Sequence, residues 1–407
     1  MKNSFCHFFI PVFISLFCGC IKDTKRIYFS INPENRQIVI PVHLCDSITA
    51  NMVFDSGPPL GTFYLDNTFY AMNLSCLISE HLIDSIKMGS AWLKKRSLGS
   101  IYKTPLKVQI GNFDFTYDFI NSYNWKGYFN SDNSDGLFNI SEKDTVNVWE
   151  LNFEYNYLEI HSAYDFIIPK NCFIFQMQKT EEHQYPFNII LPMHIKCCDG
   201  DTLSMNRTFT VDTGMPWDIA IIKPAPELEF FNNRKDAVWT QTSGGYNRRF
   251  VVNATLFDNF VMDSLRIYTF KNSNSVKCKY IIGQNFLKRF NVFFDMKNKH
   301  IGLQPIKNFQ RIVNPNHKRF YFSTTLTNDG KYIIDEVADY KENFYKTAGL
   351  RVGDEIISLN DSLYTRLNNQ ECLKIINTSD TLVLGIIRDG KFLNIIVPVD
   401  KNIEKGD

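Results

Sequence analysis

The chain has 407 residues, of which 44 are Lys or Arg and 43 are Asp or Glu, so its formal net charge at neutral pH is +1. This balance, without a strongly basic segment, argues against a nucleic-acid partner. The length is sufficient for two or three domains with sizeable cores. An aromatic content of 14%, together with many β-branched residues, favours a mostly β architecture.

The first twenty residues have the pattern of an export signal. A short positive start precedes a largely apolar run over residues 8–17, which is too short to span a bilayer but suits a signal peptide. The Cys-Gly-Cys that ends at Cys20 resembles the cleavage site of bacterial lipoproteins, which implies a signal peptide over 1–20 and a lipid on Cys20. We therefore expect an exported protein of the cell envelope, anchored to a bacterial membrane. A plain secretory signal is the alternative, and it also predicts export.

Two short segments carry an Asp, a hydroxyl residue and a Gly directly after an apolar run, with their Asp residues at positions 55 and 212. One such triplet alone is common and usually marks a turn after a strand. The sequence before each triplet is repeated as well, because residues 38–46 match residues 189–199 through their Pro, His and apolar positions. This self-similarity indicates an internal duplication that supplies two matched carboxylates.

The two matched carboxylates suggest a specific chemistry. Two carboxyl groups held close together cannot both ionise cheaply, so they share a proton. One of them then acts as a base on a water molecule while the other acts as an acid. This chemistry needs no metal, and we expect no metal site and no cofactor. His194 beside Cys197 and Cys198 is a poor chelate, because adjacent residues of a strand point to opposite faces.

The segments that follow the two triplets resemble the aspartic protease superfamily. In that family each Asp loop is followed by a strand of two apolar residues and a Gly, and then by a closing hairpin. The second half has an Ile-Ile-Gly run at 281–283 followed by 290–303, and the first half has 135–139 followed by 151–160. Asn139 stands where the family has Gly, and we explain it by the tolerance of Asn for left-handed backbone conformations.

The resemblance covers residues 37–306 and implies a bilobal pair of β-barrels, with one lobe at 28–165 and the other at 180–306. Each lobe would donate one Asp to a shared site, so that no homodimer is needed. The resemblance implies that Asp55 and Asp212 polarise a water molecule that hydrolyses the bonds of a peptide or protein substrate. Supporting roles in the two Asp loops fall to the neighbouring hydroxyl and glycine residues, Ser56, Gly57, Thr213 and Gly214.

Family members also close a glycine-bearing hairpin, the flap, over the substrate. In the second half we interpret Ser243, Gly244 and Gly245 as a candidate flap, with an ordinary hairpin turn as the alternative. The corresponding stretch of the first half, 94–100, has three cations and one Gly, and we assign it no catalytic role. This stretch, the two prolines after the first triplet and Asn139 favour the alternative of a catalytically inactive, peptide-binding lipoprotein.

Residues 348–360 resemble the central segment of a PDZ domain, which we place at 316–400. Alternating strand patterns at 332–337 and 381–391 flank this segment. PDZ domains bind an extended peptide by adding it to a sheet edge, so the resemblance implies a peptide ligand or substrate beside residues 320–322. A purely structural appendix is one alternative, and a carrier in which only this domain functions is another.

Several other residues receive structural interpretations. The cysteines that remain after signal removal resemble no disulfide framework. Cys45 and Cys198 fall at matched positions of the duplication, and we expect both to be small buried apolar residues. Asp218, close behind Trp217, is expected to lie at the surface at a strand end.

Overall fold

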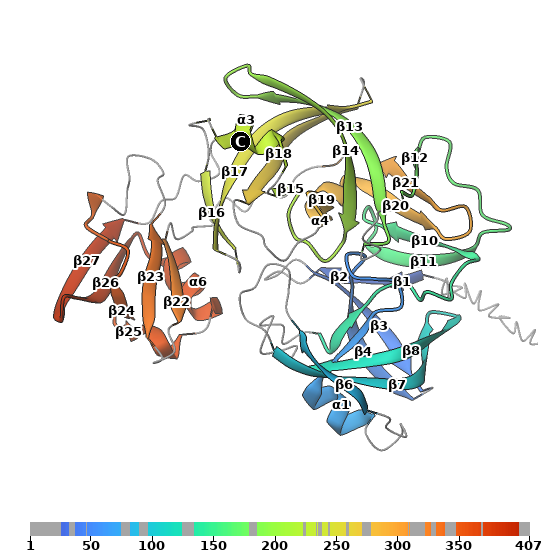
Figure 1. Cartoon of the computed structure of the whole chain (residues 1–407), viewed down its shortest axis with the longest axis horizontal. Coiled ribbons are helices and arrows are strands. Elements are labelled where there is room, and N and C mark those ends of the chain that lie inside the picture. Colours follow the sequence, from blue (N-terminus) through green and yellow to red (C-terminus); the bar gives the residue numbers. More distant parts are fainter. Residues whose placement is uncertain are drawn as a thin grey trace, which may run out of the picture.

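The structure is a computed structural model of the chain (Figure 1). The residues that it describes are 26–31, 37–45, 47–74, 82–88, 97–123, 134–178, 185–222, 225–232, 234, 238–242, 245–257, 260–270, 278–307, 309, 322–326, 331–337, 347–367 and 369–398. None of the helices in these ranges combines the length and the apolar character needed to cross a membrane. The signal segment 1–20, with Cys20, lies outside the described residues.

Two β-sheets repeat one strand order and form the two lobes. Strands that are neighbours in the first lobe are, in spatial order, β2 (Ser30–Ile31), β3 (Ile38–Leu44), β4 (Ile48–Phe54), β9 (Gly136–Phe138), β5 (Phe63–Asp66), β8 (Phe113–Tyr123), β7 (Ser97–Ile110) and β6 (Leu82–Met88). The second lobe contains, in the matching order, β13 (Asn188–Cys197), β14 (Thr202–Asp212), β19 (Tyr280–Gly283), β15 (Ile219–Ile222), β18 (Phe260–Phe270), β17 (Gly245–Leu256) and β16 (Val238–Thr242). Additional pairings of β3 with β7 and of β13 with β17 close each sheet into a barrel.

The duplicated sequence forms the same strand in both lobes because its apolar residues alternate with polar ones. In β3 the side chains of Ile38, Ile40, Val42 and Leu44 are fully buried. Pro41 and His43, which alternate with them, are exposed. Strand β13 repeats this alternation over 189–195. A period of two places every second side chain in the barrel core, so the repeat determines which face of each strand is inside.

A third sheet joins the two lobes. Its strands are, in order, β1 (Arg26–Tyr28), β11 (Tyr157–Ser162), β10 (Asn147–Asn152), β20 (Phe290–Asp295), β21 (His300–Pro305) and β12 (Phe173–Gln176). The central pair, β10 with β20, is antiparallel and places Trp149 opposite Phe294. Phe54 stacks on Trp149 with ring centroids 6.0 Å apart, and Phe187 lies 4.8 Å from Phe294. The lobes therefore share one continuous apolar core, which holds them in a defined orientation.

Short helices occupy matching places in the two lobes. Helix α1 (Asn67–Asn73) follows β5, and α3 (Glu227–Asn232) follows β15. Asp66 caps α1 by accepting hydrogen bonds from the backbone N–H groups of Thr68 and Phe69. Helix α4 (Gln284–Leu287) directly follows β19. The prediction of a mostly β, bilobal fold is confirmed.

The C-terminal part of the chain forms a separate sheet beside the lobes (Figure 1). Its strands are β22 (Phe322–Leu326), β23 (Tyr332–Val337), β24 (Glu355–Leu359), β26 (Thr381–Arg388) and β27 (Lys391–Pro398), and β25 (Ser362–Leu363) pairs with β24. The 3-10 helix η1 (Tyr364–Arg366) and α6 (Asn369–Thr378) connect β25 to β26. This unit has an apolar core of its own. The buried Asp354 carboxylate accepts two hydrogen bonds from Arg388, at 2.7 Å each.

Candidate active site

The two Asp triplets lie at the ends of matching strands. Strand β4 ends at Phe54, and the Asp55 N–H donates to the carbonyl of Phe138 on β9 at 3.0 Å. Strand β14 ends at Asp212, which lies opposite Gly283 of the parallel strand β19. In each lobe the Asp is thus held between neighbouring strands inside a barrel, where its backbone has little freedom. Rigid strand ends are suitable places for catalytic side chains.

The residues that follow the two aspartates connect the lobes through a reciprocal set of hydrogen bonds. Ser56 Oγ accepts from the Thr213 N–H and donates to the Val211 carbonyl, both at 2.9 Å. In the mirror arrangement, Thr213 Oγ1 accepts from the Ser56 N–H at 2.9 Å and donates to the Phe54 carbonyl at 3.0 Å. Both side chains are buried, so these bonds are shielded from water. The arrangement braces the two Asp loops against each other, as the sequence predicted for Ser56 and Thr213.

Replacing Ser56 by Ala is expected to lower the free energy of unfolding by about 2 to 4 kcal/mol, because the buried Thr213 N–H and Val211 carbonyl lose their partner. Ser56→Thr is expected to restore most of this loss, since the second lobe carries Thr at the matching position. Ser47→Ala, which removes an exposed hydroxyl, serves as the control and is expected to change stability by less than about 0.5 kcal/mol. Denaturant unfolding measures all three variants. Equal stability of Ser56→Ala and wild type would contradict the bracing role.

Each Asp carboxyl group reaches across to the glycine of the other lobe. A Cβ atom added to Gly57 would lie 2.7 Å from Asp212 Cγ, and one added to Gly214 would lie 2.3 Å from Asp55 Cγ. Side chains do not approach so closely, so both positions require glycine. The Asp55 and Asp212 carboxyl groups hydrogen-bond to each other. The structure therefore brings together all six residues that the sequence predicted for the two loops.

Backbone N–H groups hold each carboxylate in place. Asp55 Oδ1 accepts from the Gly57 N–H at 2.8 Å, and Asp212 Oδ1 accepts from the Met215 N–H at 2.9 Å. Both aspartates are only partly buried, so solvent reaches them. Among the described residues, backbone N–H groups hold the two carboxylates, and no side-chain hydrogen bond from a third residue is seen.

The surroundings give the two carboxyl groups different proton affinities. Burial raises the pKa of Asp55, while hydrogen bonds from Gly57, Asp212 and Gly214 oppose this rise. Burial raises the pKa of Asp212 much further, because the charge of Asp55 and the hydrogen bond to it act in the same direction. The pair therefore titrates as a unit with one shared proton, and the surroundings of Asp212 favour the protonated form more strongly than those of Asp55 do.

Tyr64 is a neighbour of the site that the sequence did not identify. It lies on β5, and its ring contacts that of Tyr123 edge-on at 5.6 Å. Burial, and in second place the charge of Asp55, raises the pKa of Tyr64 to about 12. Its phenol is neutral at physiological pH and lies within range of the Asp55 charge. Tyr64 belongs to no motif, so only the fold brings it to the site.

Asn139 occupies the position that Gly283 has in the other lobe, but for a different reason from the one expected. Gly283 has an extended backbone with φ of −108°, and Asn139 is not among the residues with positive φ, so the explanation by left-handed geometry was wrong. A Cβ atom on Gly283 would lie 2.5 Å from the Trp217 carbonyl. The loop between the Asp and the next strand covers 56–62 in the first lobe and 213–218 in the second, so it is one residue longer in the first lobe. The longer loop leaves room for a side chain at Asn139.

The Asn139 side chain uses this room to hold the Asp55 loop. Its Nδ2 donates to the Pro58 carbonyl at 2.6 Å, and its Oδ1 accepts from the Ile140 N–H at 2.7 Å. The Tyr117 hydroxyl donates to the Asn139 carbonyl at 2.7 Å. Asn139 therefore holds the proline-containing loop through its carbonyls, since the two prolines have no N–H with which to anchor the loop themselves.

The burial expected for Asp218, Cys45 and Cys198 differs from the burial in the structure. Asp218 is fully buried, because the residue that precedes β15 points into the barrel, where its Oδ2 accepts from the buried Arg266 N–H at 3.1 Å. Cys198 is exposed and Cys45 is partly buried, because both lie at the turn after their strand and not within it. The expectation of two buried cysteines was therefore wrong.

Each lobe carries a β-hairpin near the segment that was compared with a flap. In the second lobe β16 and β17 pair up to Thr242 and Gly245, while Ser243 and Gly244 lie outside the described residues. In the first lobe β6 and β7 pair up to Met88 and Ser97, and the segment between them lies outside the described residues too. The hairpin expected around Gly245 is present, and its role as a flap stays a prediction.

Comparisons with solved structures show a likeness of fold. No protein-family model matches the chain, and no curated protein matches it either. Among solved structures, the chain is similar to the crystal structure of an aspartic proteinase from Irpex lacteus, at 14% sequence identity and a TM-score of 0.47. The likeness covers 69% of this chain and 97% of that one.

Proposed function

We propose that this protein is an aspartic endopeptidase that hydrolyses peptide bonds with a water molecule activated between Asp55 and Asp212. The observation that carries the proposal is the meeting of two carboxyl groups from two duplicated lobes. They hydrogen-bond to each other, and each is held by a backbone N–H. A pair of this kind with one shared proton can serve as base and acid in the same step.

In the proposed reaction the ionised Asp55 removes a proton from water as the water oxygen attacks the carbonyl carbon of the substrate. Asp212 donates its proton to the carbonyl oxygen, which forms a neutral tetrahedral intermediate. The C–N bond then breaks as the amide nitrogen receives a proton from Asp55, and Asp212 takes back a proton from the intermediate. Each Asp ends in the protonation state in which it began. The braced loops keep both groups in place throughout, which lowers the entropic cost of the step.

The test is peptide turnover by the purified protein. Wild-type protein is incubated with a mixed peptide library over a range of pH values, and mass spectrometry identifies the fragments. We expect cleavage by the wild type and none by Asp55→Asn, which keeps the shape of the side chain but cannot act as a base. Asp165→Asn, at an exposed position, is the matched control and should cleave like wild type. Equal turnover by Asp55→Asn and wild type would refute the proposal.

The alternative is a binding protein in which the protease fold captures peptides without hydrolysing them. It was suggested by Asn139 and by the two prolines of the Asp55 loop. In this case library peptides would bind to the wild type, as measured by fluorescence polarisation, but remain intact. The hydrogen bonds that Asn139 Nδ2 donates to the Pro58 and Pro59 carbonyls favour an ordered first triplet, and this supports the catalytic proposal over the scaffold.

For the C-terminal unit we propose a PDZ-like role in which an extended peptide or substrate segment adds to the edge of the sheet. Strand β22 lies at the end of the strand order and pairs with β23 within the described residues. A sheet edge with an open side offers backbone donors and acceptors to a further strand. We also propose export and lipid anchoring through Cys20, which would place the catalytic lobes at a membrane surface of the cell envelope.

A further inference from the structure

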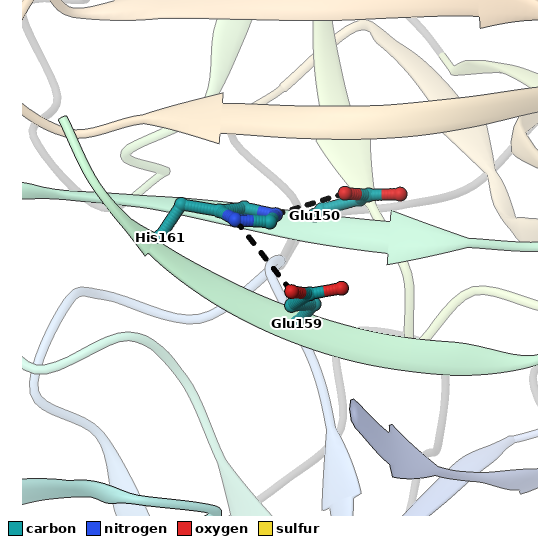
Figure 2. A group of neighbouring side chains, drawn as sticks. All are labelled: Glu150, Glu159 and His161. Atoms are coloured by element: carbon teal, nitrogen blue, oxygen red, sulfur yellow. Dashed lines mark hydrogen bonds and ion pairs between the residues drawn. The ribbon is translucent and has the colours of Figure 1, made fainter. Parts of the chain in front are cut away.

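A cluster of three ionisable side chains lies on the sheet that joins the lobes, apart from the two Asp loops. Glu150 on β10 is directly opposite Glu159 on β11, and His161 is two residues further along β11 (Figure 2). Residues that alternate along a strand share a face, so all three side chains lie on the face opposite to the apolar side chains of Trp149 and Leu158.

The position of the two carboxylates is electrostatically costly. Glu150 and Glu159 have exposed fractions of only 9% and 8%. Like charges that are directly opposite each other in a sheet are destabilising, and burial of charge adds to this cost. Arg26, whose Nε lies 3.1 Å from Glu159 Oε2, offsets part of this cost, and a further positive group between the two carboxylates would offset the rest.

The two oxygens of each carboxylate have different partners. Glu150 Oε1 accepts hydrogen bonds from the Tyr157 hydroxyl at 2.9 Å and from Asn152 Nδ2 at 3.0 Å. Glu159 Oε2 accepts from Arg26 Nε at 3.1 Å. One oxygen of each carboxylate is thus held by neighbouring donors, as is common for carboxylates that ligate metals.

The remaining oxygen of each carboxylate faces the imidazole. Glu150 Oε2 lies 2.9 Å from His161 Nε2, and Glu159 Oε1 lies 3.8 Å from His161 Nδ1 (Figure 2). The imidazole ring stacks on Phe166 with centroids 4.1 Å apart, which fixes its orientation. One ligand atom from each of the three side chains lies within 4.8 Å of the others. Small shifts of these side chains would place all three ligand atoms around one ion, with each ligand atom about 2.0 to 2.2 Å from the metal.

The duplication provides an internal comparison. The hairpin of β20 and β21 corresponds to that of β10 and β11, with Asp295 and His300 flanking its turn where the first hairpin has Asn152 and Tyr157. When both hairpins are numbered outward from these pairs, Glu150, Glu159 and His161 correspond to three uncharged residues of the second hairpin, which are Phe293, Gly302 and Gln304. The second hairpin forms without the cluster, so the hairpin itself does not require these three residues.

We propose that Glu150, Glu159 and His161 together bind one divalent first-row transition-metal ion. Two carboxylate oxygens and one imidazole nitrogen suit Zn²⁺ best, with a fourth position open to water. The ion adds positive charge between the two opposed carboxylates, on the side away from Arg26. It links β10 to β11 at the sheet that joins the lobes and stabilises the protein there, separately from the Asp55–Asp212 pair.

The experiment is a calorimetric titration of Zn²⁺ into the metal-free full chain, paired with thermal unfolding with and without the ion. We expect one tightly bound equivalent and a rise of several degrees in melting temperature. His161→Gln introduces the residue type that the second hairpin carries and is expected to weaken this binding by at least about 100-fold, since it removes a direct ligand. His300→Gln, on the second hairpin, is the matched control and should bind like wild type.

A second measurement uses only the wild type, so it does not depend on whether the His161→Gln variant folds. Crystals grown with Zn²⁺ should show an anomalous scattering peak bounded by Glu150, Glu159 and His161. A peak only elsewhere, unchanged affinity in His161→Gln or the absence of Zn²⁺ binding by wild type would each overturn the proposal.

Discussion

Asp212→Asn is expected to remove peptide cleavage and, at the same time, to stabilise the folded protein at neutral pH. Loss of a positioned general acid lowers the rate by at least about 10³-fold. The gain in stability follows from the direction of the pKa shift. Burial, together with the charge of Asp55, raises the pKa of Asp212 well above its ordinary value of 3.8. Between pH 3.8 and the raised pKa, the folded state therefore retains a proton that the unfolded chain has released.

The sign of the pH dependence follows from this difference. The pKa of Asp212 in the unfolded chain is taken as the ordinary value of 3.8. Its contribution to stability is present in full below this pH and is lost as pH rises through the raised pKa of the folded state. Asn carries no charge at any pH, so its contribution does not decline. Each unit of pKa shift that the substitution removes corresponds to about 1.4 kcal/mol.

Thermal unfolding between pH 3 and pH 8 measures the effect. The melting temperature of Asp212→Asn should exceed that of wild type by a margin that widens as pH rises. Asp165→Asn, at an exposed position, is the control and should follow the wild-type curve. A constant difference between Asp212→Asn and wild type over this range would contradict the raised pKa.

Gly214→Ala is expected to reduce peptide cleavage by about 100-fold or more while leaving the protein folded. The new Cβ would lie 2.3 Å from Asp55 Cγ. The carboxyl group is the movable end of a side chain, so the clash is relieved when it turns away from Asp212. Displacement of a reacting group by about 1 Å is enough to cost 100-fold in rate. The expected result is therefore a large loss in kcat with a small change in melting temperature.

Two further glycine variants make this test specific. In Gly57→Ala the Cβ would approach Asp212 Cγ to 2.7 Å, and a similar loss of activity is expected from the other side of the pair. In Gly302→Ala the nearest atoms would be at 3.4 Å, which is ordinary contact, so both activity and stability should remain close to wild type. Full activity of Gly214→Ala would show that the carboxyl groups need not be adjacent.

Much of the candidate site could be predicted because the duplication is visible in the sequence. The repeated triplets identified Asp55 and Asp212, and their hydroxyl neighbours, as matched residues of two lobes. The alternation of apolar residues before each triplet predicted the strands that carry them. These signals are local, because a strand period and a loop triplet are properties of adjacent residues.

Other parts of the site could not be found in this way. Asn139 looked like an exception to a glycine position, and its hydrogen bonds to the Pro58 loop depend on a loop that is one residue longer than its counterpart. Asp218 was expected at the surface, and only the packing of β15 inside the barrel shows that it is buried. In both cases the decisive contacts are with residues distant in sequence.

By itself, the sequence determined the mostly β class, the twofold repeat and the residues of the two Asp loops, because local periodicity and repeated motifs are written into neighbouring positions. Tertiary structure alone decided that the two carboxyl groups meet and that their pKa values are raised, since both depend on lobe packing and burial. It also decided that Glu150 and Glu159 are buried beside His161, because the register of β10 and β11 places Glu150 opposite Glu159 and tertiary packing removes both carboxylates from solvent.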